Sequence, residues 1–172
     1  MYAEVLTGLD VNSPSWDLFI YLFFILAIFL YGFTLGRTRI MLLIVATYMA
    51  LAAVRTAPFI FPQDVTVGSS PFFIVQITAF VGTMLVIFFL LSSTALKRAL
   101  YAEDVQGGFW QVVLFSIAHV GLLVSSVLSF LPPDRQAALL LSTREVFTTQ
   151  WSLFIWTVLP IALMMFVKPK EE

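Results

Sequence analysis

His119 is the only histidine of the chain, and its position asks for a chemical explanation. It lies near the middle of an apolar stretch, 109–131, which at about 1.5 Å per residue is long enough to cross the hydrocarbon core of a bilayer. At that depth an imidazole could relay protons, line a polar pathway or ligate a haem or chlorin. It could also be a neutral side chain bonded to a neighbouring helix. We favour this structural interpretation, because intramembrane polar groups commonly join helices.

Other polar side chains fall where they could share a pathway or a hydrogen bond with His119. Ser116 and Ser126 lie on the same face of a helix as His119. Gln76 and Thr83 interrupt another apolar stretch and are candidate partners of the imidazole on an adjacent helix. The positions of these residues therefore predict either a polar pathway or a set of interhelical hydrogen bonds.

Residue sets that carry out catalysis or hold metals do not assemble in this sequence. The chain has no cysteine, and one histidine without an intramembrane carboxylate does not complete the ligand set of a metal. The GxSxG, HExxH and phosphate-binding GxxxxGK motifs do not occur. We therefore expect a protein that is not an enzyme, and we predict no cofactor and no metal.

Composition is typical of a membrane protein. Hydrophobic residues make up 60% of the 172 and charged residues only 11%, a balance too apolar to cover the surface of a water-soluble domain. A net charge of -1 without a basic stripe argues against nucleic acid as a partner. We expect one transmembrane domain over 1–172, in contact with the lipid bilayer of a cell membrane.

Five apolar stretches predict an all-α, polytopic bundle of about five transmembrane helices. The expected spans are 16–35, 40–57, 72–96, 109–131 and a last helix that begins near 143 or 151 and ends at 167. Ser142 with Glu145 three residues later fits a capping box, which favours a start near Thr143. Pro160 is expected to kink this last helix.

The basic residues orient the bundle. Six of the nine fall on one side of a five-span arrangement, namely Arg37, Arg39, Lys97, Arg98, Lys168 and Lys170. The other three are Arg55, Arg135 and Arg144. Because cytoplasmic loops carry an excess of Lys and Arg, the N-terminus is predicted outside and the C-terminus in the cytoplasm. Lipid headgroups are the expected ligands of Arg55, Arg37, Arg39, Lys97 and Arg98.

Small residues form a second face of the stretch 109–131. Gly121, Ser125 and Ser129 recur at helical spacing, nearly opposite His119, in a pattern that lets helices approach closely in lipid. With protein expected on both faces, this helix is predicted to be central. The stripe is also predicted to join copies of the chain or other membrane subunits. Gly32 and Gly36 repeat the spacing at the end of the first span, where a tight turn explains them as well as a helix contact does.

The layout of about the first 145 residues resembles the colicin V production (CvpA) family of small bacterial inner-membrane proteins. The matching features are Asp17 at the head of the first span, Gly36 and Arg37 in YGFTLGRTRI, Asp104 and Gly107 in EDVQGG, and the segment LPPDRQAALLLS. That family usually has four spans, so a fifth helix is a departure. The resemblance implies a multi-pass protein tied to secretion, envelope homeostasis or transport, and it carries no catalytic residue to this chain.

The sequence therefore predicts a noncatalytic integral membrane protein that acts as a subunit or scaffold of a membrane assembly. Two alternatives stay open. One is a small transporter or channel whose polar pathway passes His119. The other is a cofactor-bearing subunit of an electron-transfer or light-harvesting complex.

Overall fold

A computed structural model describes residues 16–57, 72–93 and 109–166. Every regular element in these ranges is a helix, which confirms the expected all-α class for the described part of the chain. In chain order the helices are α2 (Trp16–Thr34), α3 (Arg37–Thr56), α4 (Phe72–Ser93), α6 (Phe109–Ser129), α7 (Pro133–Ala137), α8 (Leu141–Phe147) and α9 (Gln150–Phe166). The expected positions Lys97, Arg98, Asp104, Gly107, Lys168 and Lys170 lie outside the described residues.

Three of these helices, α3, α4 and α6, are long and apolar enough to cross a membrane. α8 and α9 pass the same test together, as one span bent by 46° at a short break, which raises the number to four. In α2 the apolar stretch Trp16–Tyr31 is shorter than the others. Three to four of the five expected spans are therefore long and apolar enough to cross a membrane.

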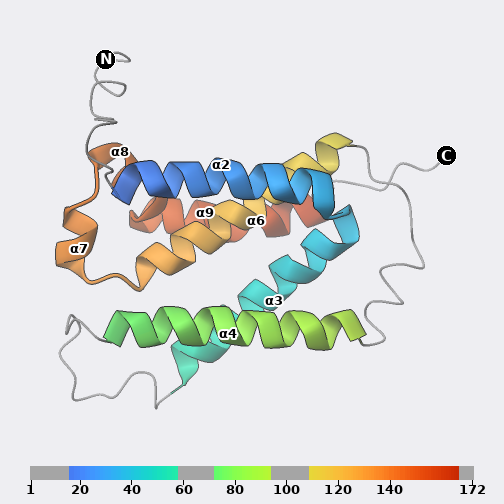
Figure 1. Cartoon of the computed structure of the whole chain (residues 1–172), viewed down its shortest axis with the longest axis horizontal. Helices are drawn as coiled ribbons and strands as arrows, with labels where there is room; N and C mark the ends of the chain where they lie inside the picture. Colours follow the sequence, from blue (N-terminus) through green and yellow to red (C-terminus); the bar gives the residue numbers. More distant parts are fainter. Residues whose placement is uncertain (1–15, 58–71, 94–108, 167–172) are drawn as a thin grey trace.

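Only Leu35 and Gly36 separate α2 from α3, which turns back diagonally across the molecule (Figure 1). Gly36 is the N-cap of α3 in an extended conformation, with φ -73° and ψ 163°. It is exposed, and a Cβ placed on it would meet nothing within 4 Å. Gly36 therefore lies in the turn without a close neighbour in the described chain, and its contact with a helix of another copy stays a prediction. Gly32 lies within α2.

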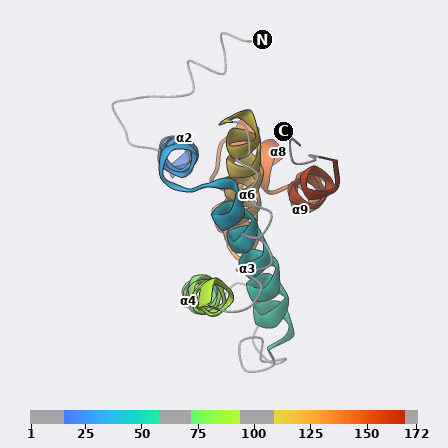
Figure 2. The same ribbon diagram turned by 90° about the vertical axis from the view of Figure 1, so that its right-hand side faces the viewer.

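α6 is the central helix of the bundle. It contacts α2, α3, α8 and α9, and the end-on view shows it between α2 and α9, with α3 running diagonally away from it (Figures 1 and 2). α4 packs along α3, at the far side from α2 and α9. The predicted central place of this helix is confirmed.

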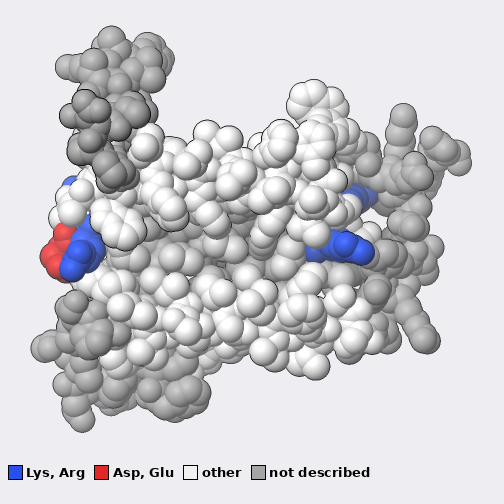
Figure 3. Space-filling model, viewed as in Figure 1, with Lys and Arg blue, Asp and Glu red and all other residues white. Residues whose placement is uncertain are grey.

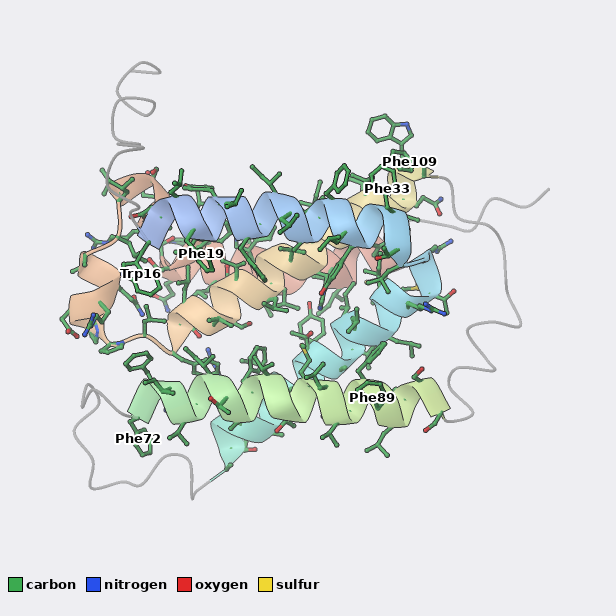
Figure 4. All side chains as sticks on the ribbon, in the orientation of Figure 1. Trp16, Phe19, Phe33, Phe72, Phe89 and Phe109 are labelled. Atoms are coloured by element: carbon green, nitrogen blue, oxygen red, sulfur yellow. The ribbon has the colours of Figure 1, made fainter. Side chains whose placement is uncertain are left out.

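The outer surface divides into an apolar body and two charged ends. Large apolar side chains cover the outward faces of α2, α4 and α9, while the described charged side chains gather at the two ends of the molecule (Figure 3). Aromatic side chains accompany each end: Trp16 and Phe72 at one, Phe33 and Phe109 at the other (Figure 4). An apolar body with aromatic and charged residues at its two ends is typical of a protein that spans a bilayer, because aromatic side chains collect at the membrane–water interfaces.

The helix before α9 does not begin with the capping box that was expected at Ser142 and Glu145. α8 begins at Leu141 with Leu140 as its N-cap and no side-chain capping bond, so Ser142 does not start the helix. The break between α8 and α9 falls at Thr148 and Thr149. α9 then continues through Pro160, and the 46° bend lies at the break before α9.

Candidate functional site

His119 sits where three helices meet. Its side chain is 0% exposed. Its Nε2 atom lies 3.0 Å from Oγ1 of Thr47 on α3. The imidazole also stacks on the ring of Tyr31 from α2, with ring centroids 5.5 Å apart and planes 20° from parallel. The histidine therefore joins α6 to both α2 and α3.

The hydrogen bonds around Thr47 assign the tautomer of His119. The Thr47 hydroxyl has one proton, which it donates to the carbonyl oxygen of Leu43 at 2.7 Å. Nε2 of His119 is then the donor to Thr47, and Nδ1 carries the lone pair. Nδ1 is buried and has no hydrogen-bond partner among the described residues. The arrangement suits a neutral imidazole that ties helices together.

The partners proposed for His119 from the sequence are not the ones that the structure places beside it. Gln76 and Thr83 are on α4, which packs along α3, and Thr47 of α3 takes the place they were expected to fill. Gln76 is nevertheless one of the three buried residues of α4. Thr47 is a threonine inside an apolar span, a signal that sequence reasoning missed.

Ser116 and Ser126 lie on α6 and are buried, yet they do not form a hydrogen-bonded chain with the imidazole. The Ser116 hydroxyl donates to the carbonyl oxygen of Val112 at 2.7 Å, four residues earlier in the same helix. The carbonyl oxygen of Ser126 accepts a bond of 2.7 Å from the Ser129 hydroxyl. Serine hydroxyls spent on their own helix backbone need no external partner.

Gly121 of α6 lies directly against the side chain of Trp156 on α9. A Cβ atom built on it would overlap the indole ring of Trp156. That indole is held in place because its Nε1 donates to the carbonyl oxygen of Val146 at 2.8 Å and its ring stacks on Phe147. The small residue at position 121 therefore allows α6 and α9 to pack closely within the chain.

The packing partner of Gly121 belongs to the same chain. Ser125, one turn further along α6, is 2% exposed. Both residues are buried within the described chain. At these two positions the stripe is used inside the chain, since neither spacing nor size distinguishes a neighbour in the same chain from another molecule, and association through the stripe stays a prediction.

Two arginines fasten α3 to α6 near opposite ends. At one end Nη1 of Arg37 donates to Oε1 of Gln111 at 3.3 Å, and its guanidinium lies 5.8 Å from the centroid of the Phe115 ring. At the other end Nη2 of Arg55 donates to the Ser129 hydroxyl at 3.2 Å. These bonds give Arg37 and Arg55 interhelical roles that the sequence did not predict, and they place Ser129, expected on a packing face, in contact with α3.

The segment from α7 to α8 is bound to the end of the bundle by two side chains. Asp17 is 3% exposed, and its Oδ1 accepts the backbone N–H of Leu140 at 3.0 Å. Nε2 of Gln136 donates to the carbonyl oxygens of Leu128 at 3.2 Å and Leu131 at 2.9 Å. Gln136 thereby satisfies backbone acceptors at the C-terminal end of α6, which would otherwise lack partners.

Within residues 16–57, 72–93 and 109–166, no three His, Cys, Asp or Glu side chains come together as a possible metal site. The Nε2 atom that could face a haem iron is engaged by Thr47.

The chain has been compared with protein-family models, with curated proteins and with solved structures, and it matches none of them.

Proposed function

We propose that this chain is a noncatalytic, multi-pass membrane protein that acts as a subunit or scaffold of a membrane assembly. The observation that carries the proposal is that three polar side chains of α6 form hydrogen bonds with neighbouring helices or with their own helix backbone. His119 bonds Thr47, Ser129 bonds Arg55, and Ser116 bonds its own helix backbone. Groups engaged in this way hold helices in fixed positions, which is a structural task.

The proposal includes five spans, with the N-terminus outside and the C-terminus in the cytoplasm. The course of the helices supports it, because α2, α3, α4, α6 and α9 run in alternating directions between the two ends of the molecule (Figure 1). The resemblance in layout to the CvpA family supports a bacterial inner membrane and a task in secretion or envelope function. An excess of Lys and Arg on the cytoplasmic side supports the orientation.

The partner is proposed to lie on α4. Only Gln76, Phe80 and Met84 of this helix are buried. Its remaining surface exposes large apolar side chains, including Val86, Phe89 and Leu90. Because Gly121 and Ser125 are used inside the chain, we place the partner on α4, whose main packing contact among the described helices is with α3.

Extraction into native-lipid discs, followed by mass measurement, tests this proposal. We expect a particle that holds either more than one copy of the 19.3 kDa chain or the chain with a second membrane protein. Replacing Phe89 and Leu90 with alanine should lower the protein mass of the particle, because both side chains are exposed on α4. The matched double replacement of Phe154 and Ile155, exposed on α9, should leave it unchanged. A single copy with lipid alone would contradict the proposal.

One observation favours a second candidate, a small transporter or channel. The Nδ1 atom of His119 is a buried acceptor without a hydrogen-bond partner in the described chain, and such a group could take a proton or a water molecule in transit. Proton flux in liposomes separates the two candidates, because the scaffold role expects none from the parent protein. The same purified sample has no visible absorption band unless a pigment is bound, which tests the cofactor-bearing alternative.

A further inference from the structure

The two ends of the bundle carry different charge. At the end where α2 meets α3, the described charged side chains are Arg37 and Arg39. At the opposite end, Arg55, Arg135 and Arg144 stand with the carboxylates Asp17, Asp134 and Glu145. Figure 3 shows blue side chains alone at one end and blue and red together at the other. Among the described residues, one end is therefore cationic and the other is balanced.

The cationic end also lies at the level of an interface. The exposed aromatic residues Phe33, Phe109 and Trp110 belong to the helix ends beside Arg37 and Arg39 (Figure 4). Aromatic rings of this kind collect where the hydrocarbon core meets the headgroups. The two guanidinium groups are therefore at the depth of lipid phosphates.

The two arginines differ in how freely they can bind. Arg37 is half-buried and is held by Gln111 and the Phe115 ring. The side chain of Arg39 is exposed and has no bonded partner among the described residues. A guanidinium binds a phosphate through two parallel N–H donors, which makes an unengaged arginine at this depth suited to a phosphate ester.

We propose that the end carrying Arg37 and Arg39 binds the headgroups of acidic phospholipids, with Arg39 as the principal contact and Arg37 as a fixed neighbouring charge. Charge complementarity selects this occupant, since a zwitterionic headgroup brings an ammonium group that the two arginines repel. Each basic residue near an anionic membrane surface changes lipid affinity by about fivefold. The inference deepens the membrane role proposed above by naming the class of lipid.

Native mass spectrometry of the full chain tests this inference, with phosphatidylglycerol and phosphatidylcholine as competing probes. The parent protein should retain phosphatidylglycerol preferentially, and Arg39→Gln should weaken that retention by about fivefold. Arg39→Lys should keep most of it. Arg135→Gln, which removes the same charge from the balanced end, is the matched control and should have no effect.

Equal retention of the two lipids by the parent protein would overturn the inference, and so would equal losses in Arg39→Gln and Arg135→Gln. Because the Arg39 side chain is exposed and bonds no described residue, its replacement is expected to leave the fold intact, which a thermal unfolding curve checks. A particle with a single copy would contradict the proposed partner without altering the lipid preference. The two proposals can therefore fail separately.

Discussion

Gly121→Ala is expected to destabilise the protein by about 1–3 kcal/mol, the usual cost of overpacking a well-filled interior. The added methyl group overlaps the Trp156 indole, so α6 and α9 must separate or the indole must turn. Turning the indole breaks its bond to the carbonyl oxygen of Val146 and its stack on Phe147. Unfolding in mixed micelles, followed by tryptophan fluorescence, measures both the stability and the environment of the ring.

Gly82→Ala is the matched control for this prediction. Gly82 lies inside α4, and a Cβ on it would meet nothing within 4 Å. Where the added methyl group meets no neighbour, replacing glycine with alanine inside a helix stabilises the helix by up to about 1 kcal/mol. The two substitutions should therefore have opposite signs. If Gly121→Ala were as stable as the parent, α6 and α9 would not be in close contact.

His119→Ala should cost about 2–5 kcal/mol of stability, the range for emptying a buried site. The substitution removes the bond to Thr47, the stack on Tyr31 and the volume of a fully buried ring. We expect the loss at every pH at which the parent protein is folded, because the imidazole contributes by filling space and bonding. The same unfolding assay measures it.

His119→Phe separates packing from hydrogen bonding. Phenylalanine keeps a flat ring against Tyr31 and loses the N–H that reaches Thr47. It should therefore recover a large part of the stability lost in His119→Ala. A protein that is fully stable as His119→Ala, yet altered in flux, would instead make the histidine a functional group of a polar pathway.

The helices that the sequence predicted best are those whose ends follow from hydropathy alone. The stretch expected at 16–35 is α2, Trp16–Thr34, and the one expected at 109–131 is α6, Phe109–Ser129. A chain in lipid must satisfy its backbone groups within each span, so a long apolar run between polar segments specifies a helix locally. No long-range information is needed for such an element.

The predictions that failed at His119 and at the start of α8 depend on residues far apart in the chain. The partner of His119 is Thr47, 72 residues away, and periodicity assigns a face to a residue without naming the helix opposite it. The start of α8 is supported by Asp17, which is 123 residues from Leu140. A local capping pattern at Ser142 cannot anticipate a carboxylate supplied by another helix.

The central claim is that the polar groups of α6 join helices within the chain, and a double-mutant cycle between His119 and Thr47 tests it most directly. The cycle compares the unfolding free energies of the parent, Thr47→Val, His119→Phe and the double variant. We expect a coupling energy of about 0.6–1.7 kcal/mol, the range measured for hydrogen bonds between membrane helices. Additive effects, with a coupling energy below about 0.3 kcal/mol, would contradict the claim, because residues that share a bond do not behave independently.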